Sequence, residues 1–404
     1  MTRRFKYIFV SASTLLTVLL LIGGVLGQTA SPDDTYRHIG VFSDVVSRIK
    51  SEYVEEPDMK SVTLGALNGM LEAIDPFASY LNAEQYKEYL KNRDVQKADV
   101  GLILSKKFGY VGVVGVAPGS PAAKAGFSTG DMIETIKGIA TRDMPLAYAS
   151  MLLQGDSGST VALSVVRVQR PEPQTVTLTR ANAVQVPVES RVLAGGVGYL
   201  KPGVLSSLTL RETTGEIDKL QKQGAQKLIL DLRNCAIGSP QDGMAFANLF
   251  LNKGLMTYLQ GQRVPRQNFD ADAGKAVTTL PLVILTNRGT ADGAEVAAAA
   301  LLGNKRAQVV GERTYGDASL RRALTMDDGA AIILSVAKYY SPDGKAIQDN
   351  GVTPGTLVAE AEPVVAVDDN GEPVPVETPD QPAAQKKLED DPVVKKALDL
   401  LAKA

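Results

Sequence analysis

Two aspartates, Asp292 and Asp317, are the residues of this chain whose setting could support chemistry. Each lies next to a glycine, and they are 25 positions apart. If their carboxylates face each other, they could share a proton as an aspartic dyad. They could also bind a hard cation such as calcium or magnesium with Glu295 or Glu312, but hard cations want several oxygen ligands and nearby arginines would compete. We therefore predict no metal and no other cofactor.

The same aspartates also have a structural explanation. Asp292 precedes an alanine-rich segment that we expect to be helical, and Glu295 follows it at the spacing of a capping box. Asp317 is followed by Arg321 and Arg322, and either arginine could pair with it. We expect Asp292 to be a helix N-cap and Asp317 to form an ion pair.

Residue counts exclude several other kinds of site. Cys235 is the only cysteine and His38 the only histidine, which excludes an internal disulfide, cysteine-rich zinc sites and catalytic arrangements that need an imidazole. His38 lies just before an amphipathic segment, and we expect it at the surface. The 43 basic and 45 acidic side chains give a net charge of -2, so nothing indicates nucleic acid as a partner. A length of 404 residues predicts about two or three domains.

The N-terminal segment, residues 1–28, predicts export. A basic flank precedes 19 mostly apolar residues, Ile8 to Leu26. As a helix with a rise of ~1.5 Å per residue, they would nearly span the ~30 Å hydrocarbon core of a bilayer. A cleaved signal peptide is the alternative, because the run Val25-Leu26-Gly27 offers a cleavage site. Either way, we expect the rest of the chain on the extracytoplasmic, periplasmic side of the inner membrane, anchored or released.

Four further regions follow from composition and periodicity. Residues 36–95 have apolar residues at three- and four-residue spacing, which predicts helices. Residues 97–182 predict short strands around turns, and residues 183–358 predict a layered α/β core. Residues 359–404 predict a proline- and acid-rich linker and a short terminal helix. The elements expected in the last two regions are strands at Val197–Leu200 and Lys227–Leu232, and helices at Thr213–Gln223 and Asp391–Lys403.

Several segments carry a family signature. Leu228–Asn234 reads L-I-L-D-L-R-N, and Tyr339–Gln348 contains Y-Y-x-P-x-G-x-x-I-Q. Ile74–Leu81 is similar to L-D-P-H-S/T-x-Y-L, with Phe77 and Ala78 as departures. The blocks around the two aspartates resemble G-S/T-A-S-A-S-E and G-E-x-T-F/Y-G-K-G. Together they resemble the C-terminal processing peptidases, the tail-specific serine proteases of peptidase family S41. The resemblance implies a mixed α/β fold: a crotonase-like peptidase core, an inserted PDZ β-domain and an N-terminal helical segment.

The resemblance implies that the catalytic residues have been replaced. The family's nucleophilic serine corresponds to Asp292 and its general-base lysine to Asp317, while Arg321 stands where a glutamine orients the lysine. An aspartate has no amine to take up the serine proton, and a carboxylate is a weak nucleophile towards amides. We therefore predict that no S41 catalytic residue is intact.

The implied oxyanion hole is also altered. The family uses the N–H after the serine, here that of Gly293, and an N–H of a glycine-rich loop, here Ile237 and Gly238. Ile237 replaces a glycine, and its Cβ restricts the backbone angles that glycine allows. We expect Gly293 still to offer its N–H to an oxyanion, and the second donor to be misplaced.

The run Pro118–Ile133, P-G-S-P-A-x-x-A-G-x-x-x-G-D-x-I, resembles a PDZ domain. Such a module adds an extended peptide to an open strand edge. The candidate loop for the peptide's terminal carboxylate is Val100-Gly101-Leu102-Ile103.

We predict an exported S41 homologue that binds the C-terminal tails of exported proteins without cleaving them, as an adaptor or a regulator. Its expected partners are peptide or protein C-termini, the membrane, and an active relative or a second copy of itself. The alternatives are an active endopeptidase with a rearranged site and a structural subunit of an envelope complex.

Overall fold

The computed structural model describes residues 33–93, 97–107, 109–142, 144–168, 170–360 and 388–403. The chain divides into two compact units, Met1–Gly65 and Ala66–Ala404. The expected export segment, residues 1–28, lies outside the described residues. Among the residues that the structure does describe, no helix is long and apolar enough to cross a membrane.

The N-terminal region is helical, as expected, but also contributes one strand. Its elements are α2 (Asp33–Glu52), α3 (Met59–Glu72), β1 (Ser79–Leu81) and α4 (Ala83–Arg93). His38 is exposed and lies inside α2, so the expectation that it precedes the helix is wrong. α3 ends before Pro76, because the residue before a proline is pushed out of the helical region. The chain after Pro76 then extends into β1, which pairs with β16 (Ala331–Tyr340).

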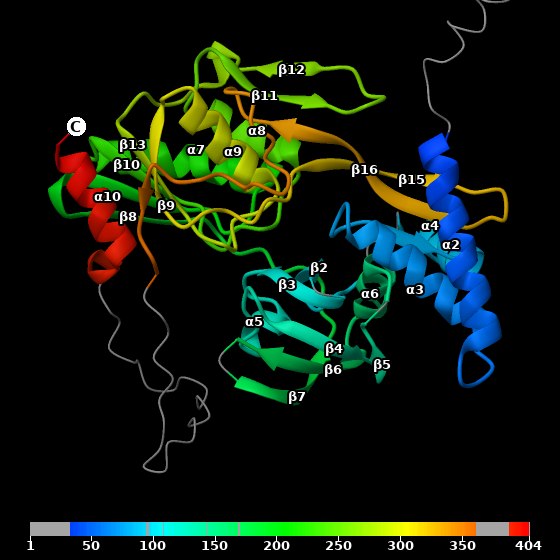
Figure 1. Cartoon of the computed structure of the whole chain (residues 1–404). Coiled ribbons are helices and arrows are strands. Elements are labelled where there is room, and N and C mark those ends of the chain that lie inside the picture. The colour runs from blue at the N-terminus through cyan, green and yellow to red at the C-terminus, as the bar shows by residue number, and fades with distance from the viewer. Residues whose placement is uncertain are drawn as a thin grey trace, which may run out of the picture. The chain divides into compact units, whose positions relative to one another are not determined.

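The next region is a twisted antiparallel sheet with two short helices (Figure 1). Its strands follow the order β2-β3-β4-β6-β7, with β5 paired to β4, so β2 is an edge strand. Val161, Leu163 and Val165 alternate into its core, as the period-2 pattern predicts. The elements are β2 (Leu102–Lys107), β3 (Tyr110–Val116), α5 (Pro121–Lys124), β4 (Met132–Ile136), β5 (Ile139–Ala140), α6 (Leu146–Leu153), β6 (Thr160–Arg167) and β7 (Arg170–Thr179).

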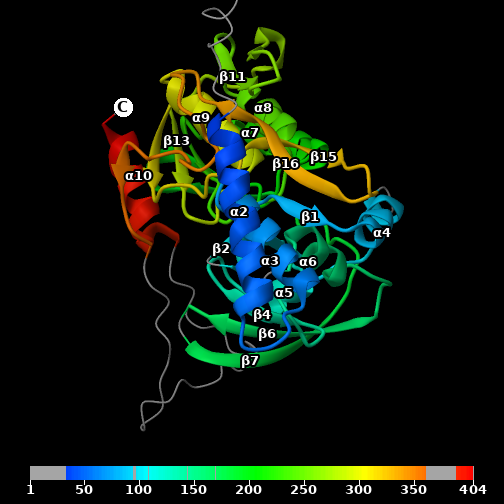
Figure 2. The ribbon, with the colours of Figure 1, turned by 45° about the vertical axis from the view of Figure 1, so that its right-hand side comes forward.

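The α/β core is built on a six-stranded sheet of order β17-β14-β13-β10-β9-β8. All neighbours in it are parallel except β8 and β9. Leu228 and Leu230 pack against α7, α8 and α9 on one face of the sheet, while Ile229 packs against α10 on the other. Figure 2 shows α10 on one side of β13 and α9 on the other. The strands are β8 (Glu189–Leu193), β9 (Val197–Lys201), β10 (Lys227–Asp231), β13 (Leu282–Thr286), β14 (Ala307–Gly311) and β17 (Thr356–Leu357). The helices are α7 (Ser207–Lys222), α8 (Pro240–Asn248), α9 (Gly293–Gly303) and α10 (Pro392–Ala402).

The strands expected at Val197–Leu200 and Lys227–Leu232 are thus confirmed as β9 and β10. Helix α7 begins earlier than expected, because Ser206 forms a capping box with Thr209. The terminal helix is confirmed as α10, with Asp391 as its N-cap.

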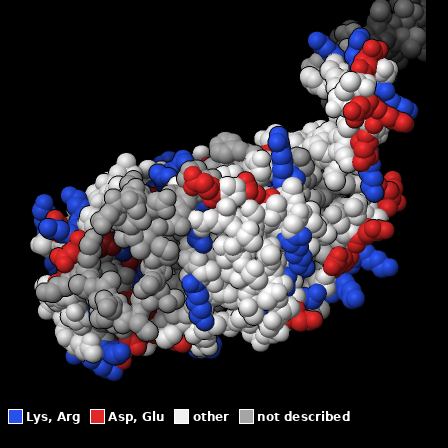
Figure 3. Space-filling model, turned by 90° about the horizontal axis from the view of Figure 1, so that it is seen from below, with Lys and Arg blue, Asp and Glu red and all other residues white. Residues whose placement is uncertain are grey.

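A second sheet of order β1-β16-β11-β12, with β15 also paired to β16, completes the core. Its other strands are β11 (Leu255–Gln260), β12 (Gln267–Asp270) and β15 (Ser319–Thr325), and three single 3-10 turns lie at Ala194–Gly196, Ala273–Lys275 and Leu388–Asp390. On the face seen in Figure 3, basic and acidic side chains are interspersed around a broad uncharged area.

Candidate functional site

Asp292 lies in a strained turn between β13 and α9. Its backbone has φ 51° and ψ -120°, which is an unfavourable region for a residue with a Cβ. The turn is fixed by a hydrogen bond of 3.0 Å from the N–H of Ala291 to the carbonyl of Cys235. Strained backbone of this kind persists only where the surrounding structure holds it, and it clusters at functional sites.

Glu295 holds both aspartate loops with one carboxylate. Its side chain is fully buried, and it accepts the N–H of Gly316 at 2.7 Å, the N–H of Asp317 at 2.7 Å and the N–H of Asp292 at 3.2 Å. The hydroxyl of Thr314 donates to it as well. Burial raises the pKa of Glu295 to about 8, although these donors oppose the shift. The sequence suggested Glu295 as a capping-box residue, but not as the residue that joins the two loops.

The N-cap expectation for Asp292 is only half right. Asp292 occupies the N-cap position of α9, and the helix ends at Gly303. Of the two bonds of a capping box, the one from the Asp292 N–H to Glu295 has hydrogen-bond geometry, whereas the Asp292 carboxylate makes no cap hydrogen bond. Its side chain is half-buried and is left to interact with the charges around it.

Asp317 forms the expected ion pair, and its partner is Arg321. Asp317 is 6% exposed, so this carboxylate has little contact with solvent. The guanidinium of Arg321 lies 4.1 Å above the centre of the Phe77 ring, a cation–π arrangement. Phe77 in turn meets Tyr315 edge-on, with 6.0 Å between the ring centres. Three positions at which the chain departs from the family signature therefore form one cluster.

The two aspartates interact electrostatically, as expected for facing carboxylates. Burial and then the charge of Asp317 raise the pKa of Asp292 well above its ordinary value of 3.8, while Arg321 lowers it. Burial also raises the pKa of Asp317 above 3.8, against the charge and hydrogen bond of Arg321. Asp317 is thus held by a guanidinium, and both carboxyl groups retain a proton more readily than an ordinary aspartate.

One predicted donor of the oxyanion hole, the N–H of Gly293, is already bonded to the backbone. The N–H of Gly293 donates to the carbonyl of Gly238 at 3.0 Å, and the N–H of Leu205 donates to the carbonyl of Ile237 at 2.7 Å. Gly238 has φ 139°, and a Cβ there would lie 2.6 Å from Leu205. The expectation that Gly293 still offers its N–H to an oxyanion is therefore wrong, because that donor is already bonded.

The cation-binding alternative finds little support. Both oxygens of Glu295 accept hydrogen bonds from the loops around them. Glu312 pairs with Arg288 at 3.2 Å. Among the residues that the structure describes, no group of three or more His, Cys, Asp or Glu could hold a metal ion.

The candidate peptide loop lies against a large cavity. Val100 is fully buried in the core of the antiparallel sheet, whereas Gly101, Leu102 and Ile103 line a cavity of about 950 Å³. Ile237 is distant from this loop in the sequence but lines the same cavity. The cavity therefore extends from the peptide loop to the loop that carries Ile237. Helix α6 packs beside β2, the strand that follows the loop.

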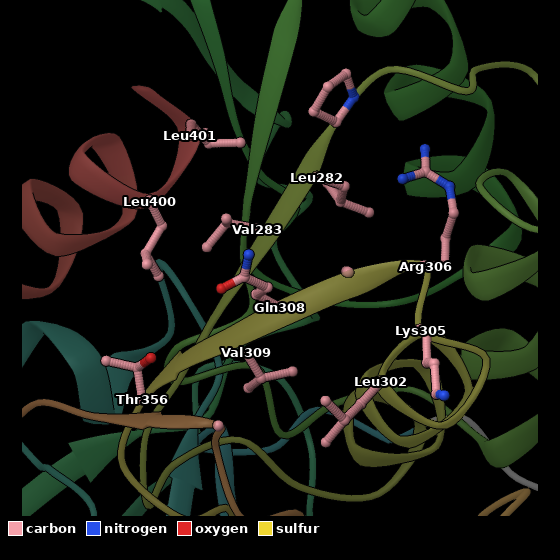
Figure 4. Close-up of a pocket in the computed structure, with 13 residues that line it drawn as sticks. Leu282, Val283, Leu302, Lys305, Arg306, Gln308, Val309, Thr356, Leu400 and Leu401 are labelled. Carbon is pink, nitrogen blue, oxygen red and sulfur yellow. The ribbon is translucent and has the colours of Figure 1, made fainter. Parts of the chain in front are cut away.

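A second cavity, of about 420 Å³, lies between β13, β14 and the end of α10 (Figure 4). Leu400 and Leu401 of α10 lie beside Leu282 and Val283 on its wall. Neither aspartate lines this cavity, and the described residues that line it include no carboxylate or nucleophilic thiol. We assign no chemistry to it.

The α/β core and the antiparallel sheet are each similar to a known protein family. Residues 196–358 match Peptidase family S41, and residues 112–167 match the PDZ domain. The carboxyl-terminal-processing protease of Synechocystis sp. is 31% identical over 350 residues, which cover 85% of this chain and 81% of that protein. The carboxy-terminal processing protease CtpA of Bacillus subtilis is 30% identical over 363 residues, covering 88% and 77%.

The chain therefore belongs to peptidase family S41, with the carboxy-terminal processing proteases as its relatives. A solved photosystem II D1 C-terminal processing protease is similar in fold, with a TM-score of 0.64 and 28% identity over 79% of this chain and 92% of that one. The mixed α/β fold with a PDZ domain, expected from the sequence, is confirmed.

Proposed function

We propose that this chain binds the C-terminal tails of exported proteins and does not hydrolyse them. The absence of hydrolysis is inferred from Asp317, which stands where the family has its general base and is already bound by other residues. Asp317 is bound by Arg321 through its side chain and by Glu295 through its N–H. Arg321 stabilises the ionised form of Asp317 and so weakens this carboxylate as a general base.

The bonded N–H of Gly293 supports the same proposal. Hydrolysis of a peptide bond needs N–H donors directed at the developing negative charge. Here the Gly293 N–H is bonded to Gly238, and the carboxylate of Asp292 lies in the adjacent turn. A carboxylate at that place repels an oxyanion, so geometry and charge both oppose the reaction.

Tail binding is supported by the open edge of β2. Lys106 donates its N–H to the carbonyl of Pro76 at 2.9 Å, so this N–H points away from β3. Because alternate residues of an antiparallel strand point the same way, the N–H groups of Leu104 and Leu102 lie on the same outer edge. A peptide can add to β2 there, beside α6, as PDZ ligands do.

The place of action that fits this function is the extracytoplasmic side of a membrane, because the N-terminus carries the apolar run Ile8 to Leu26. There the chain would act as an adaptor, or as a regulator of an active relative. One observation favours hydrolysis as a second candidate function. The pKa values of Asp292 and Asp317 are both raised, as in carboxylates that share a proton.

One experiment separates these two functions. Labelled peptides with free apolar C-termini are incubated with the full chain, and binding and cleavage are followed in the same samples. CtpA of Bacillus subtilis serves as the positive control for cleavage. Binding without cleavage, unchanged in Asp292→Ala and Asp317→Ala, supports the proposal. Cleavage that either substitution abolishes would show that the paired aspartates are catalytic.

A further inference from the structure

Among the described residues that line the large cavity, only Asp99 carries a carboxylate. Asp99 is half-buried and lines the cavity together with Gly101, Leu102 and Ile103. Its Oδ1 accepts the N–H of Gly101. Gly101 has φ 82°, and a Cβ there would lie 2.2 Å from the Cβ of Ser120, so the position requires glycine. An internal carboxylate therefore occupies an amide of the loop that the terminal carboxylate of a tail would approach.

Two cations lie near Asp99. Arg180 is 4% exposed, and its nitrogens donate to the carbonyls of Leu152, Leu153 and Thr160 and to the hydroxyl of Ser159. Its charge reaches Asp99 through space rather than through a hydrogen bond. Lys97 is exposed on the rim of the same cavity. Burial raises the pKa of Asp99 above its ordinary 3.8, while the Gly101 N–H and Arg180 lower it.

We propose that Asp99 is an internal competitor for the terminal carboxylate of a bound tail, so that it sets both the affinity and the pH dependence of tail binding. This inference rests on the proposed tail-binding function. When Asp99 is ionised, a tail carboxylate at the loop meets a like charge and finds the Gly101 N–H already bonded. When Asp99 is protonated, its hydroxyl can donate to the tail carboxylate, and the repulsion is gone.

The direction of the pH effect follows from these two states. A tail carboxylate prefers the protonated form of Asp99, so binding takes up a proton and affinity rises as the pH falls towards the pKa of Asp99. Asp99→Asn removes the charge but retains a side-chain oxygen for the Gly101 N–H. It should therefore bind free-carboxylate tails about tenfold more tightly at neutral pH, the effect of about one pKa unit of interaction.

The test measures fluorescence anisotropy of a short labelled peptide with the full chain at about pH 5 and about pH 8. The same peptide with an amidated C-terminus is the ligand control. Asp156→Asn is the matched protein control, because Asp156 is an exposed acid of the same domain that does not line the cavity. We expect tighter binding of the free-carboxylate peptide at the lower pH and in Asp99→Asn, with no change for the amidated peptide or in Asp156→Asn.

The outcomes separate this inference from the function on which it rests. Tail binding that is equal in the original chain and Asp99→Asn at both pH values would overturn the role of Asp99 and leave tail binding intact. No binding of either peptide by either protein would overturn tail binding itself, and the role of Asp99 with it. If Asp99→Asn fails to fold, the original chain alone still tests the inference. The inference is wrong if the ratio of its affinities for the free-carboxylate and the amidated peptide is the same at both pH values.

Discussion

The backbone N–H groups of Asp292 and Asp317 donate to the same atom, Oε2 of Glu295, at 3.2 and 2.7 Å. One buried carboxylate thus fixes the spacing of the two loops on which the family places its nucleophile and base. On the correspondence that the resemblance implies, these are the loops of a serine-lysine site, and the side chains on them are an acid pair. Arg321 and Phe77 complete this arrangement from two other parts of the chain.

The ion pair between Asp317 and Arg321 should stabilise the folded chain. Arg321→Ala leaves the carboxylate of Asp317 buried without its cation, and we expect it to lower the free energy of unfolding by about 2 kcal/mol, because Arg321 itself is partly exposed. Asp317→Asn combined with Arg321→Ala should recover at least half of this loss. Urea unfolding of the original chain and of these two variants measures the loss and its recovery. A double variant as unstable as Arg321→Ala alone would contradict the pairing.

Glu295 should make stability fall as the pH rises. Its pKa is raised from 4.5 to about 8 in the folded chain, so the folded state holds a proton more tightly than the unfolded state. This contribution to stability is complete below about pH 4.5 and is lost as the pH rises through about 8. Glu295→Gln cannot ionise but offers one oxygen to several donors. At low pH this variant should have a lower melting temperature than the original chain. The difference between the two melting temperatures should become smaller as the pH rises.

Glu312→Gln is the control for this experiment, because Glu312 is a partly exposed acid that pairs with Arg288. Its difference from the original chain should stay nearly constant over the same pH range. A difference for Glu295→Gln that widens as the pH rises would mean that Glu295 is ionised in the folded chain at neutral pH.

Much of the core could be predicted from local pattern. Apolar runs and capping residues, which act between near neighbours, predict β9, β10 and the span of α9. Charge spacing predicts an ion pair of Asp317 with Arg321 or Arg322, and the fold selects Arg321. The positive φ of Asp292 could not be predicted, because the carbonyl of Cys235 and the carboxylate of Glu295 impose it from outside the turn.

Contacts between segments that are distant in the sequence could not be predicted either. Phe77 stood out as a departure from the family signature, but only the fold brings its ring beneath Arg321. The N–H of Gly293 bonds to Gly238 through a contact of α9 with the start of α8, and no local pattern in either segment encodes this bond.

Restoring the two catalytic residues alone should not restore proteolysis. In the double variant Asp292→Ser with Asp317→Lys, the Gly293 N–H is still bonded to Gly238, and the new lysine lies beside Arg321. We expect cleavage of an unfolded protein to remain at least about a hundredfold slower than by CtpA of Bacillus subtilis, the effect of about one missing oxyanion donor. Cleavage at a comparable rate would show that the oxyanion loop opens on binding substrate.

The edge of β2 should accept only a short tail. The carbonyl of Pro76 already bonds the N–H of Lys106, which leaves the outer edge free only from Leu102 to about Leu104. Because one residue of an added strand covers ~3.4 Å, peptides of about four residues should bind within about twofold as tightly as longer ones with the same C-terminus. Isothermal titration of a length series measures this. Affinity that keeps rising with peptide length would mean that the peptide displaces the carbonyl of Pro76 from the N–H of Lys106.

The most direct measurement is the intact mass of an unfolded substrate protein after prolonged incubation with the full chain. Parallel samples contain the double variant Asp292→Ala with Asp317→Ala, or CtpA of Bacillus subtilis. We expect the substrate to stay intact with both forms of this chain and to be shortened by CtpA. Fragments that appear with the original chain, and not with the double variant, would contradict the account and identify the two aspartates as a working hydrolytic pair.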